Sequence, residues 1–146
     1  MPYRVDARLT GRHPFELYLL YLTFLTALPT LLGIAPRPGS ITHAMPEWLA
    51  FSWSLTLTGG AGIALAGIYW FRRDLGLIME QLGLALTSIS CLVYAAVLLS
   101  QTGISSLFPF AILAGYGVSC LVRVRHIQRF FNRAVLVQEQ NKGLDR

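Results

Sequence analysis

The sequence predicts an all-α polytopic membrane protein with four transmembrane helices arranged as two hairpins. The chain of 146 residues is 54% hydrophobic and only 13% charged, whereas a soluble domain usually has about a quarter of its residues charged. Its mean hydropathy is +0.54. The apolar residues gather in runs of about twenty, which is the length that crosses a bilayer as a helix.

Charged residues divide the chain into three parts. Residues 1–13 form a basic tail, residues 14–121 hold the membrane domain, and residues 123–146 form a basic juxtamembrane segment. Hydrophobicity places the four spans at about 15–34, 48–71, 75–100 and 105–122.

The first span begins at Pro14, because a proline in the first helical turn sacrifices no hydrogen bond. Pro29 lies inside this span, and we expect it to kink the outer half since its ring removes a backbone donor. Thr23, Thr26 and Thr30 fall on roughly one face. Their hydroxyls can bond carbonyls freed by the proline or reach a neighbouring helix.

The second span follows a loop at 35–46 that is rich in proline and glycine. Aromatic residues mark both of its ends, a pattern typical of a segment that crosses from one interface to the other: Trp48, Trp53, Tyr69 and Trp70. Its centre carries small residues spaced along one face, where another helix can approach closely: Gly60, Ala64 and Gly67.

Small residues recur in the third and fourth spans and predict close helix packing there as well. In the third span they lie at intervals of seven, at Gly76, Gly83 and Ser90. In the fourth span they lie at intervals of four, at Ala111, Gly115 and Ser119. Ser105 or Ser106 suits the N-cap of the fourth helix.

Lysine and arginine predict the orientation, because they concentrate in cytoplasmic flanks. The amino-terminal tail has three arginines, the turn after the second span has two and the segment after Leu121 has six basic residues; the outer loops hold only Arg37. Both termini are therefore predicted to lie in the cytoplasm, with the protein integral to the cytoplasmic (inner) membrane. Six arginines are candidates for binding anionic head groups or a partner protein: Arg72, Arg73, Arg123, Arg125, Arg129 and Arg133.

The last segment is predicted to form a basic amphipathic helix that continues the fourth span or bends away from it. Its apolar residues share one helical face: Ile127, Phe130, Phe131, Ala134 and Val137. Its arginines share another: Arg125, Arg129 and Arg133. Such a helix is typical of the membrane interface, and the alternative is a solvated tail.

Two carboxylates, Glu16 and Glu80, lie inside the spans at comparable depth, roughly 5–10 Å from the cytoplasmic boundary. They can form a proton- or cation-binding pair, since intramembrane carboxylates often mark ion pathways. They can instead be ionised and tied to an arginine, with Arg72, Arg73, Arg123 and Arg125 as the candidates for Glu80.

No catalytic pattern is present: the sequence lacks a phosphate loop, a metal-spaced His or Cys pair and a nucleophile elbow. We predict no enzyme, no cofactor and no metal. Cys91 and Cys120 lie in apolar runs and are predicted to be buried thiols. Nucleic acid is not an expected partner, because the basic residues flank hydrophobic runs.

Four segments give the chain a resemblance to small four-span membrane proteins of actinobacterial phages and prophages. They are HPFELYLL at 13–20, PGSI at 38–41, PEWLAFSW at 46–53 and CLVRVRHIQRF at 120–130. The resemblance spans most of the chain and implies a phage-related role, but it implies no site residue.

Three hypotheses of function follow. The first is a self-associating, holin-like protein of the inner membrane. The second is an adaptor that docks partner proteins through its basic carboxy-terminal helix. The third is a small proton-coupled transporter that uses Glu16 and Glu80. A homo-oligomer or a membrane-protein complex is expected in the first two.

Overall fold

The computed structural model describes residues 14–70 and 73–144, with side chains throughout except at Ala44, residues 73–74 and residues 130–144. Over these ranges the chain is helical, which confirms the all-α prediction. The elements are, in order, α1 (Pro14–Leu31), α2 (Gly39–Ala44), α3 (Glu47–Tyr69), α4 (Arg73–Thr102), the 3₁₀ turn η2 (Gly103–Ser106) and α5 (Leu107–Leu144). The predicted tail at 1–13 and the side chain of Arg72 lie outside the described residues.

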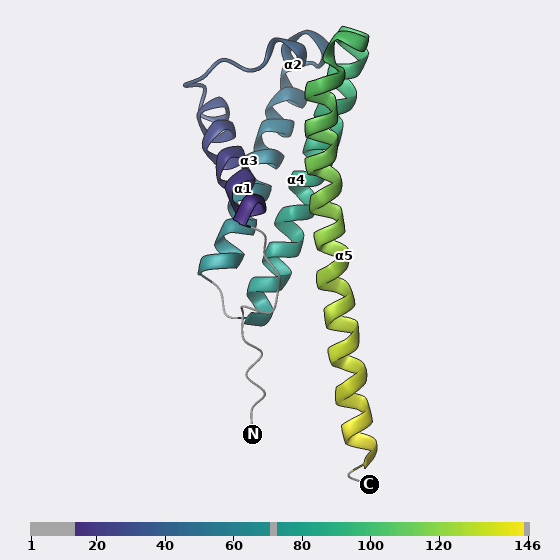
Figure 1. Ribbon diagram of the computed structural model, residues 1–146. Helices are drawn as coiled ribbons and strands as arrows, with labels where there is room; N and C mark the ends of the chain where they lie inside the picture. Colours follow the sequence, from purple (N-terminus) through teal and green to yellow (C-terminus); the bar gives the residue numbers. More distant parts are fainter. Residues whose placement is uncertain (1–13, 71–72, 145–146) are drawn as a thin grey trace.

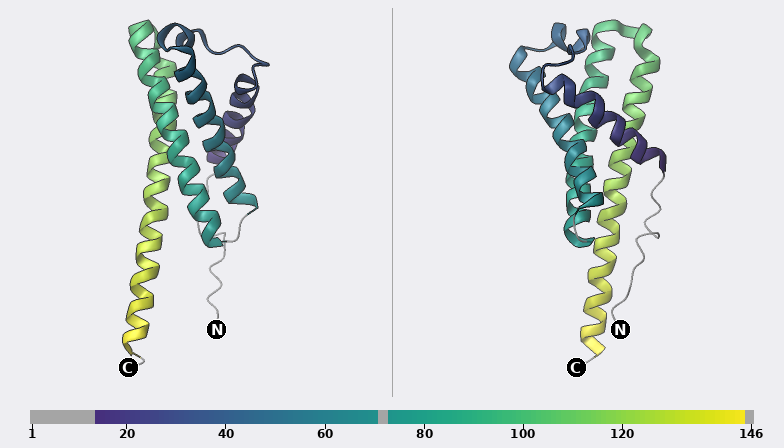
Figure 2. Two further views of the ribbon diagram at one scale, coloured as in Figure 1. Left: turned by 180° about the vertical axis from the view of Figure 1, so that it is seen from behind. Right: turned by 90° about the vertical axis from the view of Figure 1, so that its left-hand side faces the viewer.

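The helices α3, α4 and α5 run side by side and alternate in direction (Figure 1). The short elements α2 and η2 lie at one end of this bundle, and α3 meets α4 at the other. The helix α1 crosses the bundle obliquely (Figure 2). It packs against α3 and makes no close backbone contact with α5 in the described part of the chain.

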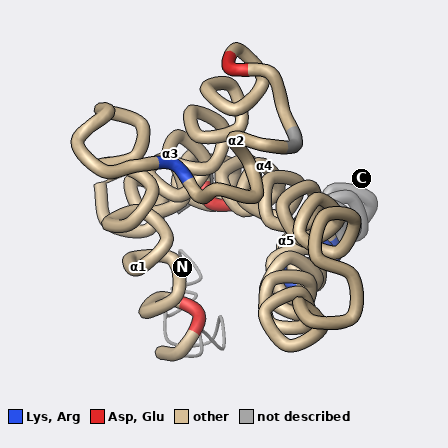
Figure 3. The backbone as a smooth tube through the Cα atoms, turned by 90° about the horizontal axis from the view of Figure 1, so that it is seen from above, with Lys and Arg blue, Asp and Glu red and all other residues tan. Residues whose placement is uncertain are grey.

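Three helical stretches of the described chain are long and apolar enough to cross a membrane: Pro14–Leu31, Glu47–Tyr69 and Leu75–Arg129. The third runs through α4, η2 and α5 and folds back on itself at η2. Seen from above, the described backbone carries few charged residues (Figure 3). These features support a membrane protein with transmembrane helices.

The first helix ends sooner than predicted, at Leu31, and Pro29 lies in its last turn. Gly33 follows with a positive φ of 71°. The amide of Ile34 donates to the carbonyl of Pro29 at 2.9 Å, and that of Gly33 donates to Thr30 at 3.4 Å. This pair of bonds closes a helix at a left-handed glycine. Pro29 therefore lies in the last turn before this helix end, and the donor that it lacks is the one to the Leu25 carbonyl.

The segment at 35–46, predicted as a loop, contains the short helix α2. Its Ile41 is fully buried, with 0% exposure, and α2 packs against α3 and α4. The hydroxyls of Ser40 and Tyr94 lie 3.5 Å apart. A single buried isoleucine thus holds the loop against this end of the bundle.

The turn between α4 and α5 contains both serines that were predicted as the N-cap, and Ser106 directly precedes the first residue of α5. Ser105 and Ser106 both lie in η2, and α5 starts after them, at Leu107. Their hydroxyls donate to carbonyl groups, that of Ser105 to Thr102 at 2.6 Å and that of Ser106 to Gly103 at 2.9 Å. The reversal instead uses Gly103, whose φ is 57°, a conformation that glycine adopts without steric cost.

The small residues of α3 pack directly against those of α4. A Cβ atom on Gly60 would lie 2.9 Å from the Thr87 nitrogen, and one on Gly67 would lie 2.7 Å from the Gly76 carbonyl oxygen. A Cβ atom on Gly83 would collide with the backbone nitrogen of Ala64. The two backbones are therefore so close that only hydrogen fits between them, as small residues permit in membrane helices.

We expect Gly83→Ala to destabilise the protein, because the added methyl group meets backbone atoms of α3 that have no room to move. The free energy of unfolding should fall by about 1–3 kcal/mol. Gly115→Ala is the matched control, since nothing lies within 4 Å of the position of its Cβ atom. Its stability should stay the same or rise by up to about 1 kcal/mol from helix propensity.

Thermal unfolding of both variants in detergent measures the difference. Equal melting temperatures would contradict the close approach of α3 and α4.

Candidate functional site

The charged pair Glu80 and Arg123 joins α4 to α5 inside the bundle. The Nη2 atom of Arg123 lies 3.5 Å from Oε1 of Glu80, and the two side chains are 14% and 3% exposed. Of the four arginines considered for Glu80, the structure places Arg123 beside it. A carboxylate in apolar surroundings needs an opposite charge close by, and Arg123 supplies it.

Glu16, on α1, shares a small pocket with this pair. The pocket has a volume of about 30 Å³ and is lined by Glu16, Leu17, Leu20, Ile68, Glu80, Leu84 and Arg123. The space is sufficient for one or two water molecules. The two carboxylates predicted as a possible pair, Glu16 and Glu80, therefore line the same pocket.

Glu80 owes its position to the glycine contacts beside it. A Cβ atom on Gly67 would lie 2.7 Å from the backbone nitrogen of Glu80, so this turn of α4 is pressed against α3. Further along, the Ser88 hydroxyl donates to the Gly117 carbonyl at 2.7 Å and fixes α4 against α5. Because α4 is fixed against both α3 and α5, Glu80 and Arg123 meet in one relative position of their helices.

Of the other candidate arginines, two have described side chains, and neither lines this pocket. Arg125 and Arg129 are exposed on α5. Arg73 and Arg133 are described by their backbone only, in α4 and α5. Among the candidate arginines with described side chains, one therefore faces the interior and two face outward.

The candidate packing residues divide in the same way. Gly60, Ala64, Gly67, Gly76 and Gly83 are all buried. Ala111 and Gly115, on α5, are exposed, and Ser119 is half-buried. These three residues of α5 therefore do not contact another helix as closely as the small residues of α3 and α4 do.

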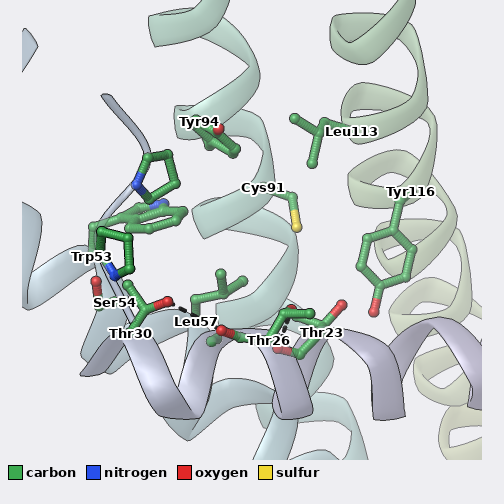
Figure 4. Close-up of a pocket in the computed structure, with 13 residues that line it drawn as sticks. Thr23, Thr26, Thr30, Trp53, Ser54, Leu57, Cys91, Tyr94, Leu113 and Tyr116 are labelled. Carbon is green, nitrogen blue, oxygen red and sulfur yellow. Dashed lines mark hydrogen bonds between the residues drawn. The ribbon is translucent and has the colours of Figure 1, made fainter. Parts of the chain in front are cut away.

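A second and larger cavity, of about 290 Å³, lies between α1 and the three other long helices. Figure 4 shows the side chains of α1 directed toward those of α3, α4 and α5 across it. Its wall is formed by Thr23, Thr26, Ala27, Thr30, Pro36, Pro38, Trp53, Ser54, Leu57, Cys91, Tyr94, Leu113 and Tyr116. No charged side chain is among these described residues.

The threonines of α1 donate their hydroxyl protons within their own helix. Thr23 donates to Leu19 at 2.7 Å, Thr26 to Leu22 at 2.7 Å and Thr30 to Thr26 at 3.1 Å. None of these three acceptors is Leu25, whose carbonyl Pro29 leaves without its usual donor. The threonine oxygens remain able to accept hydrogen bonds from the cavity side.

Trp53 corrects the predicted aromatic belt. Its indole Nε1 donates to the Ser90 carbonyl at 2.9 Å, and its ring lies 5.2 Å from that of Tyr94 at an angle of 56°. Trp48 and Trp70, by contrast, are 69% and 86% exposed. Trp53 therefore faces the cavity, while the other two tryptophans face outward.

Sequence reasoning did not identify Trp53, Tyr94 and Tyr116 as neighbours in one cavity. They come from α3, α4 and α5, and no spacing within the chain connects them. The Tyr116 hydroxyl is buried, has no hydrogen-bond partner among the described residues and points toward α1 (Figure 4). Cys91 and Cys120 are free and buried, as predicted.

Comparison of the chain with protein-family models, with curated proteins and with solved structures gives no match.

We expect the ion pair to be measurable in a double-mutant cycle. Glu80→Gln should lower the free energy of unfolding by about 1–2 kcal/mol, because an arginine loses its buried partner. The loss in Arg123→Gln should be similar. The loss of unfolding free energy in the double variant should be about 1 kcal/mol smaller than the sum of the two single losses, because the double variant leaves neither charge buried without its partner.

Glu80→Gln combined with Arg125→Gln is the control cycle, because Arg125 is exposed. Unfolding in mixed micelles should show that the two losses of unfolding free energy simply add for that pair. Additivity in the Glu80–Arg123 cycle would show that the two groups do not interact.

Proposed function

We propose that the protein is a four-span protein of the cytoplasmic membrane, with cytoplasmic termini, that self-associates through the projecting end of α5. The observation that supports this most is the length of α5, which continues for 38 residues without interruption. About 20 residues suffice to cross the hydrocarbon core. The excess must therefore extend beyond the membrane or the rest of the bundle.

The Glu80–Arg123 pair indicates where the projection begins. The start of α4 at Arg73 lies seven residues before Glu80, and α4 and α5 are antiparallel. The level of Arg73 is thus reached on α5 about seven residues after Arg123, near residue 130. In Figure 1 the end of α5 indeed extends well past α3 and α4. Residues 131–144 would add a helical arm of roughly 20 Å.

The sequence of this arm favours pairing with a like helix. The apolar face was predicted from Ile127, Phe130, Phe131, Ala134 and Val137, and it continues the side of α5 on which Val124 and Ile127 are buried. On the helical wheel Arg133, the arginine within the arm, lies at the edge of this face. Two arms paired through the centre of the face would therefore keep Arg133 at the rim of the contact.

A second copy is the partner that fits best. Two copies inserted in the same orientation have parallel arms. A two-fold axis between them lets the apolar face of one arm pack against the same face of the other. An unrelated protein would need a complementary apolar surface at the same level along the arm. The adaptor role is the alternative that remains if the arm binds a different protein.

We expect a single cysteine at Ala134→Cys to form a disulfide between two copies when isolated membranes are oxidised. The background carries Cys91→Ala and Cys120→Ala. Asn132→Cys is the matched control, because position 132 lies about 160° around the helix from position 134. Non-reducing electrophoresis of the two variants reads out the dimer.

The result would contradict the proposal if both variants stayed monomeric or if both cross-linked to the same extent. A covalent product whose mass differs from that of the dimer, formed only by Ala134→Cys, would instead favour the adaptor role.

A holin-like, phage-type role would add membrane permeabilisation to this self-association. It requires an abrupt loss of membrane potential when the protein is expressed, whereas an adaptor would leave the potential unchanged.

Proton-coupled transport is a second candidate, supported by the pocket that Glu16 and Glu80 share. Carboxylates on two helices that face one pocket can pass a proton between them, and such groups are frequent in transport pathways. For transport, Glu80→Gln must abolish proton flux in vesicles while the melting temperature stays nearly unchanged. We expect the opposite result, a weakened protein with unaltered vesicles, because Glu80 lies beside Arg123.

A further inference from the structure

The cavity between α1 and the other long helices has no part in self-association through α5. Its volume of about 290 Å³ lies close to the lower limit of small-molecule sites, about 300–1,000 Å³. That space suits a molecule the size of one ring with a short substituent. The chemistry of the wall indicates which class of molecule fits.

The wall is unsuited to a charged molecule. No charged side chain is among the described residues that line the cavity, and an ion buried without an opposite charge is strongly disfavoured. Apolar side chains from all four long helices contribute to the lining: Ala27, Leu57, Cys91 and Leu113. A neutral molecule with an apolar body is therefore favoured.

The Tyr116 hydroxyl is the buried polar group of this wall that lacks a hydrogen bond among the described residues. It points toward α1, across the cavity (Figure 4). A buried hydroxyl without a partner is unfavourable, and an acceptor placed in the cavity would remove that cost. The missing partner is therefore a hydrogen-bond acceptor.

The other polar groups of the wall already have partners. Four hydroxyls donate to carbonyl groups of their own helices, those of Thr23, Thr26, Thr30 and Ser54. Their oxygens keep lone pairs, but each hydroxyl already has one hydrogen bond. The indole N–H of Trp53 donates to Ser90, and the Tyr94 hydroxyl lies 3.5 Å from that of Ser40. Tyr116 is thus the donor best placed to hold a ligand.

An uncharged, largely apolar cavity with one unsatisfied donor suits a neutral molecule with one acceptor. We propose that this cavity binds a small apolar carbonyl compound, such as a ketone, whose oxygen accepts the Tyr116 proton. The hydrocarbon part of the molecule lies against Leu57 and Leu113. Water accepts the same proton but leaves these apolar side chains uncovered.

Three probes with one carbon skeleton separate the contributions: acetophenone, α-methylstyrene and 1-phenylethylamine. In α-methylstyrene a CH₂ group replaces the carbonyl oxygen, which removes the acceptor at nearly constant shape. The amine carries a positive charge at neutral pH. Equilibrium dialysis of the full-length protein in detergent, against protein-free micelles of the same detergent, measures binding and corrects for partition into the micelle.

We expect Tyr116→Phe to weaken acetophenone binding about five- to tenfold, because one hydrogen bond is lost. Binding of α-methylstyrene should not change, and 1-phenylethylamine should bind at least about tenfold more weakly than acetophenone. Tyr94→Phe is the matched control, since its hydroxyl lies beside Ser40. It should bind acetophenone like the parent.

The infrared band of the bound carbonyl gives a second readout. Acetophenone labelled with carbon-13 at the carbonyl should absorb at lower frequency in the parent than in Tyr116→Phe, because a hydrogen bond weakens the C=O bond. The Tyr94→Phe control should keep the frequency of the parent.

Filling the cavity tests its location. Thr26→Trp with Leu113→Trp should weaken binding of acetophenone and α-methylstyrene at least about tenfold, because both positions line the cavity. Leu22→Trp with Val118→Trp is the matched control on the same two helices, since these side chains are 58% and 51% exposed. The control should bind like the parent, and melting temperatures should show that both variants fold.

Four results would overturn the proposal. Equal effects of Tyr116→Phe on acetophenone and α-methylstyrene would make the cavity a site for apolar chains. Amine binding as tight as that of acetophenone would contradict a neutral occupant. Binding that survives the filled cavity would place the ketone elsewhere. Absence of binding by every probe would remove the site altogether.

Discussion

The close approach of α3 and α4 is the contact on which the rest of the structure depends. Their backbones meet where Gly60, Gly67 and Gly83 carry only hydrogen, so one register is sterically available. In a bilayer, helices gain little from hydrophobic burial against each other, and dense packing of this kind is the main source of association. That register fixes the level of Glu80, and the bond from Ser88 to Gly117 transfers it to α5. The ion pair with Arg123 follows from these contacts.

The helix α1 is held differently, and the larger cavity is a consequence. Its contact with α3 includes the Phe24 ring, which would lie 3.2 Å from a Cβ atom on Gly62. It has 18 residues, and it crosses the bundle obliquely (Figure 2). An oblique helix cannot stay in contact with α5 along its length, so side chains of all four long helices border the space that remains. The glycines that bring α3 and α4 together have no counterpart between α1 and α5 among the described residues.

Patterns within one helix were readable from the sequence, whereas contacts between helices were not. The spacing of Gly60, Ala64 and Gly67 showed a face suited to close packing, but it could not show that Gly76 and Gly83 form the opposing face. The same spacing at Ala111 and Gly115 leads to an exposed surface, because small residues permit an approach without requiring one. Trp53 looked like an interfacial residue by its position in the span. Its orientation depends on the Ser90 carbonyl of a different helix, which no local pattern encodes.

The straight course of α5 has a simple cause in its sequence. A helix that leaves a span and turns to lie on the membrane surface needs a break, and breaks occur at proline, at glycine or at an inserted residue. From Val122 to Lys142 the chain contains neither proline nor glycine, and the helix is continuous there. The basic amphipathic segment therefore extends the axis of the span instead of crossing it. In the proposed self-association, a second copy covers the apolar residues of this segment that lie past the start of α4 and removes them from water.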